Sequence, residues 1–371
     1  LANEAEVDGT ITWDYEKHGL APWMQFFYDW RFADLTGDGQ IDILLTGGAR
    51  RQVAYAQSGE ELWRYEDPLP YEEGGAGFLD IRPDANFPVA DIDADGVPEL
   101  VCARKVDGVL MLCVVNARTG ELKAQVPYPD TEHRPPDCRG SILLANLSGE
   151  GPPSELIVSW DYGSIAALNA DLGDRWRRTL AHEAGRRHTT MGHTPYVADI
   201  DGDGRDEVVA GSCLVDYDGT TRWVAPDLPA LVTDGHADSV QIVQLRPDAT
   251  PNVVMSTGGY CFDGSGRLLW GRDELKHGQA QHVGKLRDDV PGKQVVVYEG
   301  ASRVDRTLPD HVLVLTAGGE LLWDREVLQP DMQEGGFGFW LGDWNGDGLD
   351  EVFVNDPEKV NILNGYGEVI D

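Results

Sequence analysis

The chain has 371 residues with 64 Asp and Glu against 30 Lys and Arg, a formal net charge of −34, which disfavours nucleic acid and anionic membranes as partners because both would be repelled. A hydrophobic fraction of 41% allows a substantial core, and 44 Gly with 21 Pro indicate many turns. No apolar run reaches the roughly 18 residues of a membrane-spanning helix, so no such helix is expected.

Two repeated markers alternate along the chain. The first is an acidic loop between apolar segments, which begins at Asp34, Asp91, Asn146, Asp199 and Asp343, with versions lacking the carboxylates near Gln244 and Lys285. The second is a Gly turn followed by a strand that ends in Trp, found at residues 8–13, 59–63, 174–176, 218–223, 266–270 and 319–323, while residues 120–123 lack the Trp. Internal repeats of this period indicate a repeat architecture.

Each repeat reads as four short antiparallel strands in about 40–50 residues, which is typical of a propeller blade. Helical periodicity is absent. We therefore predict an all-β, seven-bladed β-propeller of four-stranded antiparallel blades, forming a single domain over residues 1–371. The last repeat lacks a Trp-ending strand, and residues 9–13 supply one, so the N-terminal strand is expected to close the last blade and remove both free edges. An open sandwich is the structural alternative.

The acidic loops have the spacing of a calcium site. Asp199, Asp201, Asp203, the carbonyl of Arg205 and Glu207 alternate at loop positions 1, 3, 5, 7 and 9, where oxygen ligands can wrap one hard cation. Three further loops match: Asp91, Asp93, Asp95 and Glu99; Asp343, Asn345, Asp347 and Glu351; and, with a hydroxyl at position 3, Asp34, Asp38 and Asp42. We expect several Ca²⁺ ions that mainly stabilise turns, with one catalytic ion as the alternative.

The redox state and the location follow from other features. Five cysteines, without zinc spacing, are Cys102, Cys113, Cys138, Cys213 and Cys261. Cys102 and Cys113 flank a tight hairpin and could face each other in a disulfide or remain buried thiols. No charged-then-apolar leader follows Leu1, so no signal peptide is expected within this sequence. Calcium loops of extracellular affinity favour a secreted or periplasmic protein.

A site assembled from several blades is expected on the face opposite the acidic loops, around the central channel. Imidazoles from four repeats precede the innermost strand there: His18, His188, His193, His236, His277 and His282. Other loops on this face add Arg104, Arg139, Tyr162, Arg187 and Tyr260. Such a local cationic cleft suits a carboxylated sugar. The partner expected is an anionic polysaccharide or oligosaccharide bound by a monomer. The structural alternative is that the histidines cap strands and bond to neighbouring blades.

Two segments resemble the rhamnogalacturonan lyases of polysaccharide lyase family 11. They are residues 188–219, which contain His-Thr-Thr-Met-Gly-His and the Asp199 loop, and residues 277–295, which contain His-Gly-Gln-Ala-Gln-His-Val-Gly and Pro-Gly-Lys-Gln-Val. The resemblance implies a calcium-loaded β-propeller with repeats of the FG-GAP/VCBS type that cleaves rhamnogalacturonan I by β-elimination. Members of that family are usually longer, with about eight blades, so eight blades is the alternative to seven.

The resemblance implies a lyase that removes the C5 proton of a uronic acid and expels the 4-linked sugar. A base takes the proton, a cationic group neutralises the carboxylate, and an acid protonates the leaving oxygen. We expect the base among His193, His236 and His282, and the acid to be Tyr260 or Tyr196. Residues expected to hold substrate are His188, His277, Arg139, Arg187, Arg104 and Tyr162.

Three other functions remain open from the sequence. A lyase could act on ulvan or another rhamnose–glucuronate polysaccharide. A glycoside hydrolase could use the same face. A non-catalytic propeller could bind carbohydrate or protein in a calcium-dependent way.

Overall fold

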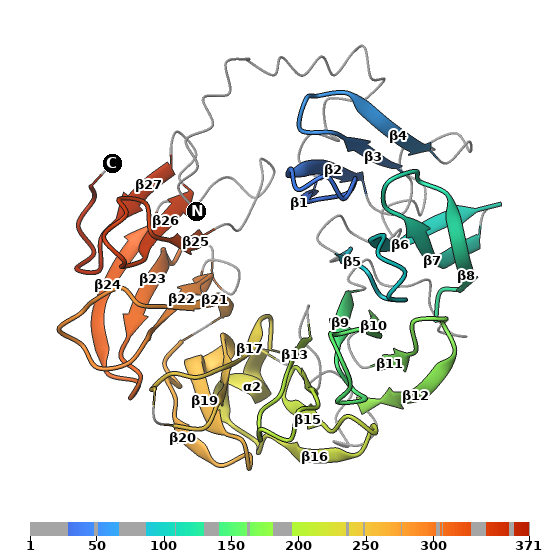
Figure 1. Ribbon diagram of the computed structural model, residues 1–371. Coiled ribbons are helices and arrows are strands. Elements are labelled where there is room, and N and C mark those ends of the chain that lie inside the picture. The colour runs from blue at the N-terminus through green and yellow to red at the C-terminus, as the bar shows by residue number, and fades with distance from the viewer. Residues whose placement is uncertain are drawn as a thin grey trace.

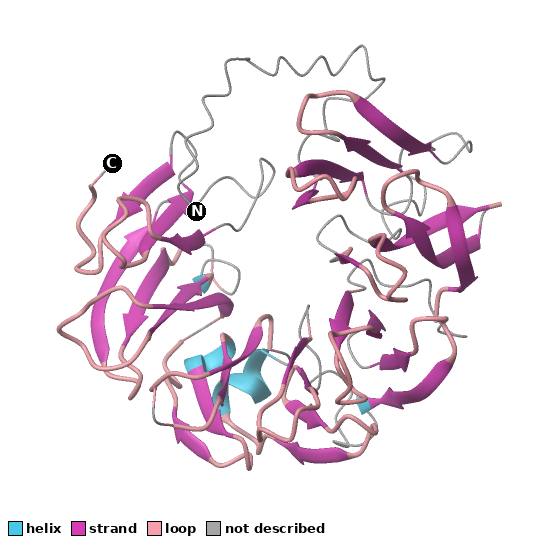
Figure 2. Cartoon of the chain, in the orientation of Figure 1, coloured by secondary structure: helices cyan, strands magenta, loops and turns pink. Residues whose placement is uncertain are grey.

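The computed structural model describes residues 29–47, 51–66, 87–107, 109–129, 141–161, 164–180, 195–234, 237–247, 249–275, 277–301, 305, 307–327, 339–355 and 360–370. Short antiparallel strands dominate these residues, and the short helical segments among them include α2 (Pro229–Asp234) and η3 (Thr257–Gly259) (Figure 2). No helix in this part of the chain has the length and apolarity needed to cross a membrane.

Seven antiparallel sheets, here numbered 1 to 7, follow one another along the chain. Sheets 1 to 3 contain β1 (Asp29–Ala33), β2 (Asp42–Gly47), β3 (Arg51–Tyr55) and β4 (Glu61–Glu66); β5 (Val89–Ala90), β6 (Glu99–Val106), β7 (Val109–Asn116) and β8 (Leu122–Pro127); and β9 (Ile142–Ala145), β10 (Glu155–Asp161), β11 (Ser164–Leu168) and β12 (Asp174–Thr179). Sheets 4 and 5 contain β13 (Tyr196–Ala198), β14 (Glu207–Ala210), β15 (Cys213–Val215) and β16 (Thr221–Val224); and β17 (Val240–Val243), β18 (Asn252–Met255), β19 (Tyr260–Asp263) and β20 (Leu268–Trp270). Sheets 6 and 7 contain β21 (Gly278–Gly284), β22 (Gln294–Glu299), β23 (Asp310–Leu315) and β24 (Leu321–Val327); and β25 (Phe339–Gly342), β26 (Glu351–Asn355) and β27 (Val360–Leu363).

The sheets lie in chain order around a common centre, with the first strand of each sheet innermost (Figure 1). First strands of successive sheets contact one another, as in the series β9, β13 and β17 and in the pair β21 and β25. The prediction of an all-β chain with seven antiparallel sheets is therefore confirmed. Sheet 7 has three strands among the described residues. The strand expected at residues 9–13 to complete it lies outside them.

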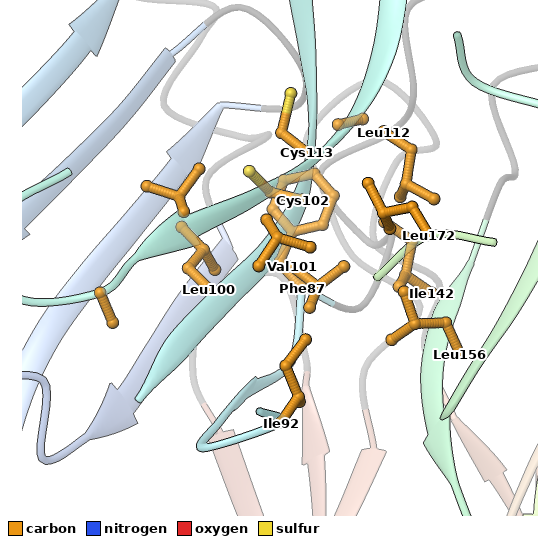
Figure 3. Close-up of a cluster of buried hydrophobic side chains, with 14 of the residues drawn as sticks. Phe87, Ile92, Leu100, Val101, Cys102, Leu112, Cys113, Ile142, Leu156 and Leu172 are labelled. Carbon is orange, nitrogen blue, oxygen red and sulfur yellow. The ribbon is translucent and has the colours of Figure 1, made fainter. Parts of the chain in front are cut away.

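The core lies between neighbouring sheets. Middle strands such as β11 are buried along their whole length, and buried strands read as continuous apolar runs rather than as alternating ones. Figure 3 shows one such cluster, in which Leu112 of sheet 2 lies toward Ile142 and Leu156 of sheet 3, whereas Leu100 lies on the opposite side of sheet 2. Burying a Leu or Ile side chain stabilises the fold by roughly 1.5–3 kcal/mol, so each pair of sheets is joined mainly by apolar packing.

The repeated Trp and Gly markers are two halves of one contact between sheets. In sheet 4, Trp223 donates its indole N–H to the carbonyl of Gly264 in sheet 5 at 3.1 Å. A Cβ on Gly266 would lie 2.6 Å from Trp223 Cγ, and Gly266 has φ +84°, a conformation that favours glycine. Four more pairs repeat both features: Trp63 with Ala117 and Gly120, Trp176 with Tyr217 and Gly219, Trp270 with Ala317 and Gly319, and Trp323 with Gly365 and Gly367.

The exception supports this interpretation. Sheet 2 has Ala124 where other repeats have Trp, and the following turn in sheet 3 has Leu172 at φ 66° in place of glycine. Leu172 is buried in the cluster against which Ala124 packs. A large side chain in the turn thus accompanies the loss of the large ring.

The cysteine alternative is settled for four of the five residues. Cys102 and Cys113 are cross-strand partners on β6 and β7, but they form no disulfide, and Cys213 and Cys261 are likewise reduced. All four are buried. Burial raises the pKa of the Cys113 thiol to about 12, so it is protonated at neutral pH. Cys138 lies outside the described residues.

Candidate functional site

The acidic loops join the first and second strands of their sheets and are fixed by their last carboxylate. This position 9 residue is nearly inaccessible, with exposed fractions of 1% for Asp42, 0% for Glu99 and Glu207 and 3% for Glu351. In each loop it accepts a hydrogen bond from the backbone N–H at position 2, as Glu207 does from Ile200 at 2.9 Å. The second strand therefore anchors the start of its own loop.

The first carboxylate shapes the turn. The two oxygens of Asp199 accept hydrogen bonds from the backbone N–H groups of Gly202 at 2.6 Å and Gly204 at 2.9 Å. Asp34 and Asp343 make the equivalent pairs of bonds. These bonds curl the loops, and in sheets 2 and 4 the remaining carboxylates converge.

The converging oxygens have the chemistry of a hard-cation site. Ligand oxygens of Asp91, Asp93 and Glu99 lie within 4.8 Å of one another, as do those of Asp199, Asp201 and Asp203. Burial raises the pKa of Glu207 to about 7. Its Oε1 accepts no hydrogen bond from the described residues, although the Arg222 guanidinium lies 3.1 Å away. Carboxylates and carbonyls without sulfur or imidazole are the ligands that Ca²⁺ prefers, so the residues present fit that ion.

Two described candidates, His277 and Tyr260, lie at the other end of the sheets. Because every sheet is built from consecutive antiparallel strands, the second-to-third turns and the connections between sheets share one end, and the acidic loops share the opposite end. His277 precedes β21 and Tyr260 begins β19, so both lie at the end predicted for a multi-sheet site.

His277 forms a buried pair with Asp238. Its Nε2 lies 3.0 Å from Asp238 Oδ2 and 3.3 Å from Gln279 Oε1. The exposed fractions are 7% for His277 and 4% for Asp238. A carboxylate beside an imidazole fixes the orientation of its ring. The two residues come from the connections before sheets 6 and 5, so this pair joins adjacent sheets.

A close backbone approach places His277. A Cβ on Gly278 would lie 1.9 Å from the carbonyl oxygen of Ser256, so only glycine allows β21 to begin there. His277 in turn accepts a hydrogen bond on its carbonyl from Gly300 at 2.8 Å.

Tyr260 is part of the packing rather than of an open surface. It is 1% exposed, and its hydroxyl donates to Asp273 Oδ1 at 2.5 Å and accepts from the backbone N–H of Ala230 at 3.1 Å. Burial, followed by the bond to Asp273, raises the pKa of Tyr260. This geometry ties α2 to the loop after β20 and gives the hydroxyl no free position for a sugar oxygen.

His282 has the properties of a neutral imidazole. It lies on β21, half-buried, with its ring edge-on to Phe339 of sheet 7 and ring centres 4.7 Å apart. Burial lowers the pKa of His282. An imidazole that is unprotonated near neutral pH can accept a proton.

The remaining described candidates differ in accessibility. Arg104 is 5% exposed and lies between sheets 1 and 2. Its Nε donates a hydrogen bond to Gln52 Oε1 at 2.9 Å, and its guanidinium lies 4.4 Å from the centre of the Tyr65 ring. Tyr196 is 38% exposed at the start of β13. Tyr196 can therefore reach a ligand, whereas Arg104 joins two sheets.

Six sequence candidates lie outside the described residues: His188, His193, His236, Arg139, Arg187 and Tyr162. Their placement is not part of the geometry above. Conversely, the structure adds Asp238 and Asp273, which the sequence interpretation did not select. Asp238 follows His236 by two residues in the segment before β17, a signal that could have identified it.

Sequence comparison finds rhamnogalacturonan lyases. No protein-family model matches the chain. The rhamnogalacturonan exolyase YesX of Bacillus subtilis (strain 168) is 24% identical over 426 residues, covering 95% of this chain and 63% of the relative. The rhamnogalacturonan endolyase YesW of the same strain is 23% identical over 299 residues, covering 64% of this chain and 46% of the relative. The chain thus spans less than two thirds of these relatives.

Solved structures agree on the fold. YesX superimposes with a TM-score of 0.63 at 21% identity, covering 92% of this chain and 67% of the other. The Bacillus licheniformis rhamnogalacturonan lyase PL11 gives 0.64 at 22%, covering 93% and 66%. The Vibrio cholerae biofilm matrix protein Bap1 gives 0.58 at 15%, covering 91% and 78%. The relatives named as rhamnogalacturonan lyases are polysaccharide lyases, and this chain shares their fold.

Proposed function

We propose that this chain is a polysaccharide lyase that cleaves a rhamnogalacturonan-type polysaccharide by β-elimination. The observation that carries the proposal is the match of 95% of the chain to a rhamnogalacturonan exolyase, together with likeness in fold to that enzyme over 92% of the chain. The substrate is an anionic polysaccharide of rhamnose and uronic acid, bound by a monomer. A secreted or periplasmic location of the enzyme fits a substrate that is a polysaccharide.

The seven sheets form one closed seven-bladed β-propeller over residues 1–371 in this proposal. Five Trp–Gly contacts join successive sheets. The turn of sheet 1 has Gly59 at φ +83°, and a Cβ built there meets no described residue within 4 Å. Trp13 ends the remaining Gly-to-Trp marker. We propose that residues 9–13 complete sheet 7 and that Trp13 packs on Gly59, which closes the ring.

The reaction needs a base for the C5 proton. Its electron pair passes into the carboxylate-stabilised enolate, the bond from C4 to the leaving oxygen then breaks, and that oxygen takes a proton. His282 suits the base because burial lowers its pKa, and His277 is oriented by Asp238. His193 and His236 remain candidates for the same role. Tyr196, which is 38% exposed, suits the acid better than Tyr260, which is 1% exposed.

The charge on the substrate must be balanced by the protein. Arg139 or Arg187 would bind the uronate carboxylate, since a guanidinium matches it with two parallel hydrogen bonds. His188 and Tyr162 would contact the neighbouring sugar. Arg104 is already engaged with Gln52, so its proposed contribution is to hold sheets 1 and 2 together beneath the site.

Calcium would be held by the four acidic loops that begin at Asp34, Asp91, Asp199 and Asp343. When bound, the ion neutralises carboxylates in the turns and stiffens them. The loops are at the opposite end of the sheets from His277 and Tyr196, which supports a structural role in loops of the FG-GAP/VCBS type.

The test is an activity assay on purified protein with rhamnogalacturonan I, ulvan and unbranched polygalacturonate. A lyase on the proposed substrate raises the absorbance of the unsaturated uronate with rhamnogalacturonan I. A rise with ulvan alone would move the proposal to rhamnose–glucuronate polymers. New reducing ends without that absorbance would indicate a hydrolase, and binding without turnover would indicate a non-catalytic propeller.

Variants connect the assay to the site. His282→Gln and His193→Gln each keep a polar group of similar reach but remove the imidazole base, and loss of a general base typically costs about 10²–10⁴ in rate. His311→Gln is the matched control because His311 pairs with Asp324 on the outer strands of sheet 6. Full activity in both active-site variants would remove these residues from the mechanism.

A further inference from the structure

The acidic loop of sheet 2 already contains a cation of its own. The ammonium of Lys123, on the fourth strand β8, lies 2.7 Å from Asp93 Oδ2, 2.9 Å from Asp95 Oδ2 and 2.8 Å from Glu99 Oε1. These are the carboxylates at positions 3, 5 and 9 of the proposed calcium loop. The Lys123 side chain therefore uses the oxygens that an ion would need.

Sheets 3 and 4 repeat this arrangement with arginine. The guanidinium of Arg222 lies 2.7 Å from Asp201 Oδ2 and 3.1 Å from Glu207 Oε1. In sheet 3, Arg175 pairs with Glu155. Each cation stands three residues after the positive-φ residue of its turn, as Lys123 does after Gly120. The repeat thus has one defined position from which a side chain enters the acidic loop.

In sheets 5 and 6 the corresponding loops are stabilised by side-chain hydrogen bonds. These two loops have no carboxylate at position 1 or 3, and the first loop residue supplies N–H donors. Lys285 donates from Nζ to the carbonyls of Val290 at 2.9 Å and Gly292 at 3.2 Å. Gln244 donates from its amide to Pro247 at 2.9 Å and Ala249 at 2.8 Å. Each loop is therefore closed around a side chain of the protein.

Sheets 1 and 7 have the carboxylates without such a group. Asp42 accepts hydrogen bonds from the backbone N–H groups of Leu35 and Gln57, and Glu351 accepts from Trp344 N–H and the Asn345 amide. No Lys or Arg pairs with these two loops among the described residues. In sheet 1 the position that carries Lys123 in sheet 2 is occupied by Leu62.

We infer that Lys123 and Arg222 are built-in replacements for calcium, so that tight calcium binding is confined to the loops of sheets 1 and 7. The inference rests on the proposed calcium role and refines it from four equivalent loops to two. An ammonium or guanidinium repels a divalent ion and occupies its ligands, so the loops of sheets 2 and 4 bind it weakly.

The two calcium-dependent sheets stand at the ends of the described series. Figure 1 shows sheet 1, with β1 to β4, and sheet 7, with β25 to β27, at the two ends of the series, with no other described sheet between them. Calcium would then act where the ring closes, and the other five sheets would keep their turns without it. Chelation is expected to loosen sheets 1 and 7 first.

The test is calcium titration of chelator-treated protein by calorimetry, with three variants. Wild-type protein is expected to bind two ions tightly. Lys123→Met, which removes the charge and keeps the stem, should add a third tight site. Leu62→Lys, which installs the ammonium in sheet 1, should weaken one of the two wild-type sites at least about tenfold, whereas Leu62→Met should not.

Terbium luminescence is a second measurement, which checks that the variants are folded. Bound terbium is expected to luminesce on Trp excitation through Trp344, which lies within the sheet 7 loop, and this signal should be unchanged in Leu62→Lys and Lys123→Met. Four equally tight ions in wild-type protein, unaltered by Lys123→Met, would overturn the inference and leave the calcium proposal intact. No calcium binding at all would overturn both, and neither outcome alters the lyase assay.

Discussion

The Trp–Gly contact between sheets makes a prediction that separates packing from backbone strain. Gly266 has φ +84°, and a Cβ there would lie 2.6 Å from Cγ and 2.8 Å from Cδ2 of Trp223. Gly266→Ala therefore has two costs. A non-glycine residue in this conformation costs roughly 1–2 kcal/mol, and moving a packed ring to relieve a clash costs about 1–3 kcal/mol.

The expected loss in the free energy of unfolding is thus about 2–5 kcal/mol. Gly39→Ala is the matched control, because Gly39 has φ +83° and nothing within 4 Å of its built Cβ. It should lose only the roughly 1–2 kcal/mol of strain. Both variants are compared by urea denaturation with saturating calcium, so that the loop containing Gly39 is held in the same state.

Gly59→Ala extends the comparison to ring closure. Gly59 has the same turn and φ as Gly266, and in the proposed closed ring it faces Trp13. Gly59→Ala should then cost as much as Gly266→Ala, and Trp13→Ala should relieve much of that cost. Equal losses in Gly266→Ala and Gly39→Ala would refute the packing argument, and a Gly59→Ala variant that matches Gly39→Ala would refute closure by Trp13.

Three further predictions concern single side chains. Tyr260→Phe leaves Ala230 N–H and Asp273 without their partner, so it should lower the free energy of unfolding by about 1–3 kcal/mol, measured by denaturation. Turnover of the folded protein in the lyase assay should not change, and a specific loss of turnover would restore Tyr260 as the acid. His282 has a pKa lowered from 6.5, so the unfolded chain binds its proton more readily. The stabilising effect of neutral His282 is present above pH 6.5 and is lost as the pH falls through the folded pKa. His282→Gln should therefore lose less stability on acidification than the wild-type protein. Parallel curves of unfolding free energy against pH for the two proteins would contradict the assignment. The buried thiols Cys102, Cys113, Cys213 and Cys261 should react with a thiol reagent only after denaturation, and reductant should leave the melting temperature unchanged; a drop in melting temperature with reductant would indicate a disulfide.

The repeat made the fold readable from the sequence. Gly and Trp at fixed spacing, such as Gly266 and Trp270, marked the turn and the outer strand of each unit, and the acidic loops marked the first and second strands. The contact between the two markers could not be read, because it joins Trp223 of one sheet to Gly266 of the next. Sequence periodicity describes one unit, whereas that contact depends on how units pack.

The candidate site was predicted less well, for a physical reason. Residue type and loop position placed His277, Tyr260 and Arg104 near the expected face, but they did not indicate burial. Tyr260 and Arg104 have polar ends engaged with Asp273 and Gln52, partners 13 and 52 residues away. Asp238 was missed because it is one of 64 acidic residues, and only its place two residues after His236 distinguishes it in the sequence.

The most direct test of the proposed β-elimination is whether cleavage adds water to the products. Rhamnogalacturonan I is digested in water labelled with heavy oxygen, and the fragments are weighed by mass spectrometry. A lyase breaks the C4–O bond without adding water, so the new ends should carry an unsaturated uronate and no label. Label in the new reducing ends, with saturated uronate at the other end, would contradict the proposed lyase activity and indicate hydrolysis.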